Sequence, residues 1–394
     1  MALIWRPGKA SRGVLLLTAA LAVMGYLLVE GFPQKVKKAH YSEKLRAARQ
    51  MEKGMEAIRQ ARLAIFGRIN PETDPAGTGM IGEPLTPITS KAGKLSAKQA
   101  AANPNFAALL VQFYKKAGLK EGDVVALAFS GSFPSLNLAA LTAAETLKLK
   151  PVPIVSLSAS QFGANNPEFT WLDMERILFE KGLIRTRSVA ASLGGHEDRG
   201  KGLSPEGVRL LREAIRRNPG VEFIDPASLS ASIDLRTNVY QEAAGDKPIA
   251  AYVNVGGGIG SVGSTLVKQS FKPGLNLSVP EAAGLADSVM TRMAKNGVPV
   301  IHLVYIEKLA RQHGIIIHPD RRGRAGEGRL FLAKGYNLYI VWGVLAGLCL
   351  SLFVLLRLDF RTYMLRFVGM LSHPRKRNGG EGAPQGSVPP APRP

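Results

Sequence analysis

The sequence predicts an α/β protein with a doubly wound, mostly parallel sheet. Short apolar runs such as 124–129 (VVALAF) and 249–255 (IAAYVNV) alternate with helical segments. Strands that are apolar at nearly every position are typical of parallel sheets covered by helices on both faces. The chain of 394 residues is 46% hydrophobic, which is enough for a large core. Its single cysteine, Cys349, excludes a disulfide framework and a cysteine-based zinc site, and we expect no metal and no cofactor.

The elements of this domain, residues 70–334, are predicted in order. Residues 70–89, rich in proline and glycine, form a long loop or linker. Ser204 and Pro205 give one helix an N-cap and a first-turn proline. The expected helices are 96–117, 133–147, 169–181 and 204–217, and the expected strands are 124–129, 152–157, 188–192, 222–224, 249–255 and 299–305.

Two uncharged segments, 13–29 and 335–356, predict transmembrane helices that flank the domain. A cleaved secretory signal is the alternative for the first segment. Arginine and lysine after the second segment place both termini in the cytoplasm and the main domain outside, in a two-pass cell-membrane protein. The remaining parts are a basic cytoplasmic N-terminus (1–12), an amphipathic juxtamembrane helix (30–69), an interfacial amphipathic helix (357–371) and a disordered cytoplasmic tail (372–394).

The juxtamembrane helix carries one apolar stripe with charges on its other faces. This stripe packs on its own domain, mediates self-association, or lies along a partner. The whole chain has 51 Lys+Arg against 30 Asp+Glu, a net charge of +21. Such an excess favours a polyanionic partner. For an outward-facing domain we expect an anionic polymer or a membrane surface and no nucleic acid.

Four predicted loops follow the carboxyl ends of strands, where α/β sheets bind ligands. They are 130–134, 158–166, 192–200 and 254–264, and all are rich in Gly, Ser and Asn. Backbone N–H groups in such turns favour anions. We therefore expect one crevice, whose candidate ligand-binding residues are Ser160, Gln161, Asn165, Gly194, Gly195, Arg199, Asn254, Gly256, Gly257 and Gly258.

Catalytic candidates lie in the same loops. Ser130 and Ser132 occupy the position of a nucleophile, and His196 and Asp198 could act as base and orienting acid. The alternatives are helix caps for the serines and an exposed polar loop, or a metal ligand, for His196. The loop 258–263 matches G-x-G-x-x-G, but Lys272-Pro273-Gly274 ends any following helix too early for a dinucleotide fold.

Six segments also carry a family resemblance, and they occur in this order: NPETDPAGTGMIG, AANPNFAALL, VVALAFSGSFPSLNLAAL, SASQFGANNPEFTWLDMERIL, SVAASLGGHEDRGKGLSPEG and YVNVGGGIGSVGS. Across residues 70–264 the chain resembles the poly-γ-glutamate system protein family. The resemblance implies a bacterial locus for poly-γ-glutamate biosynthesis and export, with the polymer and the synthase membrane subunits as partners. It implies no catalytic residues.

The leading hypothesis is a membrane-anchored component that binds the anionic polymer or supports the synthase complex, with a homo-oligomer as an open possibility. The second is an amide hydrolase or transferase with a Ser–His site that acts on γ-glutamyl bonds. The third is an anion- or nucleotide-binding module with an unrelated ligand. Sequence alone leaves these three open.

Overall fold

A computed structural model describes the chain except for residues 1–11, 282–285, 319 and 358–394. The chain divides into two compact units, residues 36–333 and residues 1–35 with 334–394. The predicted interfacial helix and C-terminal tail, and nearly all of the basic N-terminus, lie outside the described residues.

The larger unit is built on a seven-stranded sheet with the order β7-β6-β4-β3-β8-β10-β9. All neighbouring pairs are parallel except β10 and β9. The strands are β3 (Val124–Ser130), β4 (Lys150–Ser156), β6 (Ala190–Ser192), β7 (Glu222–Ile224), β8 (Ile249–Val255), β9 (Gly274–Asn276) and β10 (Val300–Leu303). From β3 the chain moves outward through β4, β6 and β7, and it then returns to β8 on the other side of β3. The loops after β3 and β8 therefore meet at a topological switch point.

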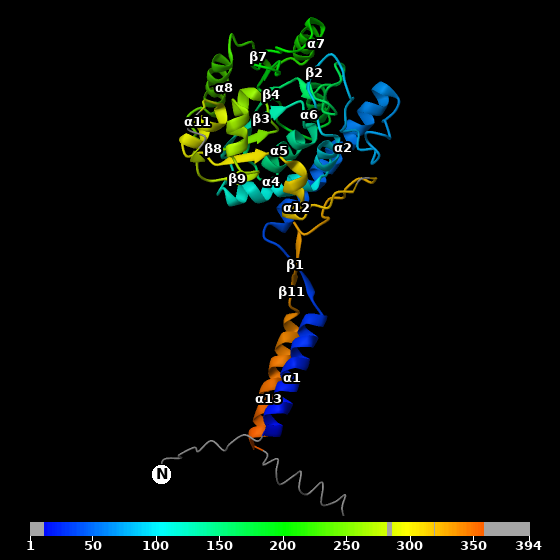
Figure 1. The fold of residues 1–394 in the computed structure, drawn as a ribbon, viewed down its shortest axis with the longest axis vertical. Helices are drawn as coiled ribbons and strands as arrows, with labels where there is room; N and C mark the ends of the chain where they lie inside the picture. The colour runs from blue at the N-terminus through cyan, green and yellow to red at the C-terminus, as the bar shows by residue number, and fades with distance from the viewer. Residues whose placement is uncertain (1–11, 282–285, 319, 358–394) are drawn as a thin grey trace, which may run out of the picture. The chain divides into compact units, whose positions relative to one another are not determined.

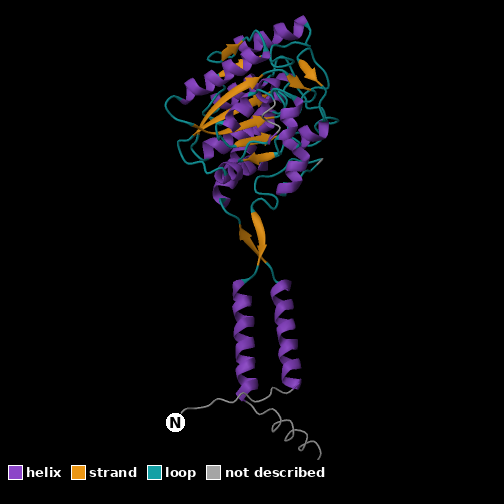
Figure 2. Ribbon diagram, turned by 60° about the vertical axis from the view of Figure 1, so that its left-hand side comes forward, coloured by secondary structure: helices purple, strands orange, loops and turns teal. Residues whose placement is uncertain are grey.

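Strand β3 shows why the sheet needs cover on both faces. Val125, Leu127 and Phe129 belong to one hydrophobic core, and the alternate residues Val124 and Ala126 belong to another. Successive side chains of a strand point to opposite faces, so a strand apolar at every position feeds two cores. Figure 2 shows the strands enclosed by helices.

The larger core holds residues from helices α2 (Tyr41–Phe66), α3 (Leu95–Ala101), α4 (Asn105–Lys116), α5 (Pro134–Thr146), α6 (Trp171–Glu180), α7 (Pro205–Arg216) and α12 (Ile306–His313). The smaller core holds residues from helices α8 (Leu229–Ala244), α9 (Ile259–Val262), α10 (Thr265–Ser270) and α11 (Val289–Lys295). Labels α8 and α11 in Figure 1 lie across the sheet from α2 and α6. The predicted helix 96–117 is two helices, because residue 104 is a proline and Asn103 turns the chain there.

The amphipathic helix predicted within 30–69 is α2, and it packs on its own domain. Met51 and Ile58 on its apolar stripe are fully buried. At Gly54 a Cβ atom would lie 3.0 Å from Leu138 Cδ2 of α5 and 3.3 Å from Leu178 Cδ2 of α6, so the glycine allows close contact with both helices. Of the three alternatives for this stripe, the structure shows the first.

The smaller unit contains α1 (Arg12–Gly31) and α13 (Leu338–Arg357), which pack side by side (Figure 1). They approach closely at Gly25, where a Cβ atom would lie 2.5 Å from Val344 Cγ1. Strands β1 (Gln34–Lys37) and β11 (Leu332–Gly335) form a separate two-stranded sheet.

The prediction of two transmembrane helices is wrong. Within the described residues, no helix has both the length and the apolar character that crossing a membrane requires. The two-pass topology, the cell-membrane localisation and the outward placement of the main domain are corrected with it.

Candidate functional site

The four predicted loops converge on one cavity at the carboxyl ends of β3, β4, β6 and β8. Its volume is about 320 Å³, at the small end of ligand sites. The predicted residues that line it are Ser130, Ser132, Gly194, Gly195, His196, Gly257 and Gly258. Further lining residues are Ser90, Lys91, Ser156, Ser158, Ile259, Val262, Ser264, Thr265 and Lys268. We call this cavity the crevice.

Two lysines enter the crevice, and none of its lining residues is acidic. Strand β2 (Thr89–Lys91) pairs with β5 (Ala159–Ser160), and this pairing sets Lys91 beside Ser160. Lys268 is held through its backbone, because its carbonyl oxygen is 3.1 Å from Nε2 of the buried His302. Burial, and then the charge of Lys268, lowers the pKa of Lys91. An anion in the crevice would relieve both costs.

The glycines after β8 bring the backbone close to these cations. Lys91 Nζ lies 3.4 Å from the carbonyl oxygen of Gly257. A Cβ atom on Gly257 would lie 3.3 Å from Lys268 Nζ, so a larger residue would push the lysine aside. In the described structure, the backbone N–H groups of Gly257 and Gly258 donate no hydrogen bond to the protein. The loop therefore offers free donors next to two cations, an arrangement suited to a carboxylate or phosphate.

Asp198 has a structural position below the crevice. Its side chain forms a buried ion pair with Arg236 Nη2 at 2.8 Å. The same carboxylate accepts hydrogen bonds from Ser156 (2.9 Å), Ser192 (2.7 Å) and Ser232 (2.6 Å). Helix α9 packs directly on the pair, since a Cβ atom at Gly260 would lie 2.6 Å from Asp198 Oδ2.

The proposed pairing of His196 with Asp198 is not present in the structure. The His196 side chain is 71% exposed, and its Nδ1 lies 3.7 Å from Glu197. No hydrogen bond joins the His196 side chain to Asp198, Ser130 or Ser132 in the described part of the chain. The hydroxyl and guanidinium donors around Asp198 already occupy both carboxylate oxygens, so this residue does not orient a histidine.

Arg199, the predicted ligand cation, also points elsewhere. Its Nη1 donates to the carbonyl oxygen of Ala227, and the same atom lies 3.9 Å from Glu197 Oε2. Arg199 is not among the residues that line the crevice. The Arg199 side chain therefore contacts the segment just before α8, although the residue is close in sequence to Gly194 and Gly195.

Other predicted ligand residues hold loops in place. Asn165 is fully buried and bridges Glu83 and Thr89. Asn254 is also buried and donates to the carbonyl oxygen of Gly256 and to His302. Gln161 accepts a hydrogen bond from the backbone N–H of Gly93, at 3.1 Å. These amides fix the backbone on which the crevice depends. Gly256, with φ 77°, makes the turn after β8.

Sequence reasoning missed Lys91, Lys268 and the buried Lys98, which lies behind Ser132. Lys98 sits in the segment SAKQAA, and alanine on both sides of a helical lysine is a weak signal of burial. Lys268 follows the glycine-rich loop by one helical turn. No sequence pattern links these positions, because the fold brings them together from three separate elements.

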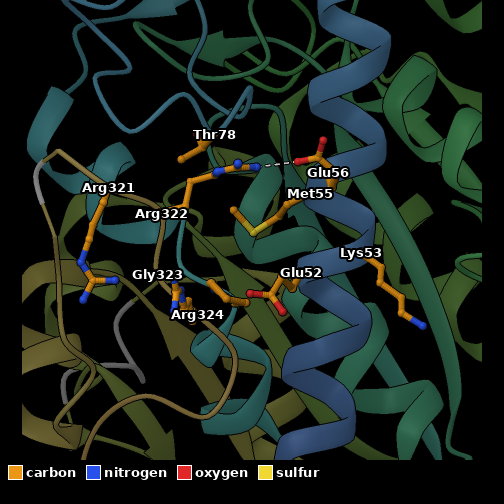
Figure 3. Close-up of a pocket in the computed structure, with 10 residues that line it drawn as sticks. Glu52, Lys53, Met55, Glu56, Thr78, Arg321, Arg322, Gly323 and Arg324 are labelled. Carbon is orange, nitrogen blue, oxygen red and sulfur yellow. Dashed lines mark hydrogen bonds and ion pairs between the residues drawn. The ribbon is translucent and has the colours of Figure 1, made fainter.

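A second cavity, of about 490 Å³, lies between α2 and the loop that contains Arg321, Arg322 and Arg324 (Figure 3). Two carboxylates, Glu52 and Glu56, face these arginines.

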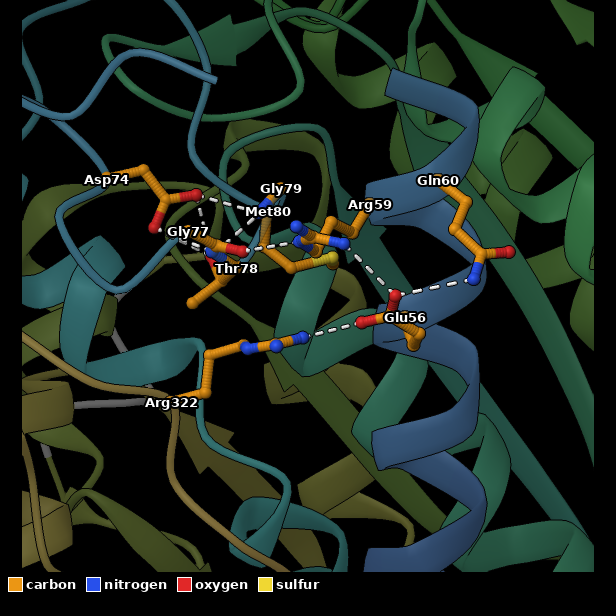
Figure 4. A network of polar contacts seen from close by, with 9 residues as sticks. All are labelled: Glu56, Arg59, Gln60, Asp74, Gly77, Thr78, Gly79, Met80 and Arg322. Atoms are coloured by element: carbon orange, nitrogen blue, oxygen red, sulfur yellow. Dashed lines mark hydrogen bonds and ion pairs between the residues drawn. The ribbon is translucent and has the colours of Figure 1, made fainter. Parts of the chain in front are cut away.

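Figure 4 shows the polar contacts of Glu56, which lines this second cavity, and of Asp74 nearby. Glu56 accepts from Arg322, Arg59 and Gln60. Asp74 accepts from the backbone N–H groups of Thr78 (2.9 Å) and Gly79 (2.7 Å). Arg321 and Arg322 are paired with carboxylates, and Glu52 and Glu56 line this cavity, whereas the crevice has no acidic lining residue. We therefore prefer the crevice as the candidate site for an anion.

The described residues contain no cluster of three or more His, Cys, Asp or Glu side chains placed to hold a metal ion. Comparison of the chain with protein-family models, with curated protein sequences and with solved structures gives no significant match. The fold and the crevice therefore define a class only: an α/β protein with a cavity at its switch point that is lined by two lysines and no acidic residue.

Proposed function

We propose that residues 36–333 bind a carboxylate-bearing chain in the crevice, and that this chain is poly-γ-glutamate or a similar anionic polymer. One observation carries the proposal: Lys91 and Lys268 converge on a cavity whose lining contains no acidic side chain. Like charges held close together are costly unless an anion is present. The crevice also supplies serine hydroxyls and free backbone N–H groups as neutral donors for carboxylate oxygens.

The size of the cavity limits what is bound. A volume of about 320 Å³ holds a short piece of a polymer and not a long stretch of it. The net charge of +14 between residues 31 and 334 would attract the rest of the anionic polymer through long-range electrostatics. A role beside the synthase subunits of a poly-γ-glutamate system is part of this proposal, and its support is the resemblance of residues 70–264.

The test is calorimetric titration of the full-length chain with short γ-linked glutamate oligomers at low and moderate salt. The double variant Lys91→Ala/Lys268→Ala should lose at least about tenfold in affinity, since each lost charge-assisted contact is worth about 1.5 kcal/mol or more. The matched control is Lys181→Ala, an exposed lysine at the end of α6, which should bind like the wild type.

Two further ligands test which kind of anion the crevice binds. Inorganic phosphate and α-linked glutamate oligomers are titrated under the same conditions. Tight binding of phosphate alone would assign the crevice to a phosphate ligand. Absence of any binding by the wild-type chain at low salt, or equal affinity in the double variant, would contradict the proposal.

A further inference from the structure

Lys98 is a buried amine with an unusual set of neighbours. The residue is 3% exposed and extends from α3 toward the turn between β3 and α5. Its Nζ atom donates to the carbonyl oxygen of Ser132 and lies 2.8 Å from Ser160 Oγ. The same atom lies 3.7 Å from the centre of the Phe133 ring. No carboxylate forms an ion pair with Lys98 in the described structure.

These three contacts can be satisfied by a neutral amine as well as by an ammonium group. A neutral lysine has two N–H donors and one lone pair. The Ser132 carbonyl and the ring face of Phe133 can each take an N–H, and the Ser160 hydroxyl can donate to the lone pair. A hydroxyl that donates to an unprotonated amine is arranged for transfer of its proton.

The charged groups around Lys98 favour this neutral form. Burial, and then the nearby charge of Lys91 on β2, lowers the pKa of Lys98 to about 7. Helix α12 packs against α3, but its Glu307 is 2.6 Å from Lys94 Nζ at the start of α3. Glu307 is therefore occupied by another lysine.

Ser160 lies between residues that line the crevice. Its backbone N–H donates to Ser132 Oγ at 2.9 Å, and its strand partner is Lys91. Ser132, Ser158 and Lys91 all face the cavity. Ser160, which is 4% exposed, is not itself a lining residue, but it lies directly behind this part of the wall because its strand partner Lys91 lines the cavity.

We propose that Ser160 is a nucleophile with Lys98 as its general base, and that the crevice hydrolyses an amide or ester bond of a carboxylate-bearing substrate. The substrate class rests on the proposed function, whereas the serine–lysine chemistry does not. Lys98 takes the place that sequence reasoning gave to His196.

The reaction balances with water as the second substrate. Ser160 Oγ forms a bond to the carbonyl carbon while its proton moves to Lys98 Nζ. The carbon–nitrogen bond then breaks, and Lys98 gives that proton to the leaving amine. Water attacks the resulting serine ester and passes a proton to Lys98, and the ester bond breaks as Ser160 Oγ takes the proton back. The products are a carboxylic acid and an amine.

The test is labelling of the full-length chain with a fluorophosphonate, a probe that reacts with activated serines, followed by peptide mapping. We expect the label on Ser160, with a labelling rate that rises with pH and has its midpoint near the pKa of Lys98, about 7. Lys98→Met should lower the rate by about a hundredfold, as loss of a general base does. Ser160→Ala should remove the label, and Ser135→Ala, which changes a buried serine of α5 that does not line the cavity, should retain it.

Several outcomes would overturn the proposal: no labelling, labelling of Ser132 or another serine, or a rate unchanged by Lys98→Met. Thermal unfolding of each variant shows whether it is folded. If Lys98→Met does not fold, the wild-type pH profile decides, and a flat profile between pH 6 and pH 8 counts against the lysine. Titration of Ser160→Ala with γ-glutamate oligomers keeps the two proposals apart, because binding should survive when labelling is lost.

Discussion

Two buried cations lie beneath the crevice, and their surroundings differ sharply. The Arg236 side chain is 1% exposed and has the carboxylate of Asp198 and the hydroxyls of Ser156 and Ser192 as partners. Lys98 is almost as buried and has a carbonyl, a hydroxyl and an aromatic ring but no carboxylate. The first arrangement is complete and holds three elements together. The second keeps an amine that can gain and lose a proton, which is a property that reactive sites need and structural sites avoid.

The largest expected effect comes from breaking the complete arrangement. Asp198→Asn keeps the size of the side chain, and asparagine tolerates the backbone φ of 62° at this position. The substitution leaves Arg236 buried without a counter-charge, which typically costs about 3–5 kcal/mol in the free energy of unfolding. Urea denaturation measures this loss.

The control for this prediction is Arg209→Ala on α7. Arg209 is also paired with two carboxylates, but the three side chains are between 37% and 54% exposed. Its removal should leave the urea midpoint unchanged. A similar loss in both variants would mean that the burial of the Asp198–Arg236 pair has no special role.

A smaller effect, with a distinctive pH dependence, is expected for Lys98→Met. The pKa of Lys98 is about 7 in the folded chain against 10.5 unfolded, so between these values the unfolded state binds more protons. The stability contribution of Lys98 therefore rises with pH across this window and is at its lowest below pH 7. Relative to the wild type, the methionine variant should be most stable at or below pH 7 and lose up to about 2.7 kcal/mol of that advantage by pH 9.

Urea denaturation of both proteins from pH 6 to pH 9 provides the measurement. The difference between the two proteins is compared, because other groups that titrate in this range cancel. A difference that does not change with pH would show that Lys98 stays charged when folded, and would also weaken its assignment as a base.

The smallest effect is expected for Arg199→Ala. From the sequence, this loop arginine is the favoured ligand cation. In the structure its guanidinium bonds to Ala227 and lies outside the crevice. Its replacement should change the affinity for γ-glutamate oligomers by less than about twofold, because distant exposed charges are largely screened over about 8 Å at physiological salt. A loss of affinity equal to that of the Lys91→Ala/Lys268→Ala variant would show that Arg199 contributes to binding in the crevice.

The sequence was informative where a pattern is local. The runs at 124–129 and 249–255 become β3 and β8, and the rule on strand ends correctly brings Ser132 and Gly257 to one cavity. Helix α8 was not predicted, because its buried face includes a serine and Arg236 and does not look apolar. The Asp198–Arg236 pair joins residues 38 positions apart, and no spacing rule reveals such a partnership.

The apolar segments near the two ends, 13–29 and 335–356, were wrongly predicted to be transmembrane helices. Apolar composition alone led to the prediction of membrane spans, although no helix among the described residues combines the length and the apolar character that a span requires.

The two borders of the main sheet have a consequence for the behaviour of the protein at high concentration. Both outermost strands, β7 and β9, contain three residues, and β9 runs antiparallel to its neighbour. Short outer strands offer few unpaired backbone groups to a second chain, so they protect against edge-to-edge aggregation. A variant that extends β7 with β-branched residues should therefore remain folded but precipitate at concentrations at which the native chain stays dispersed.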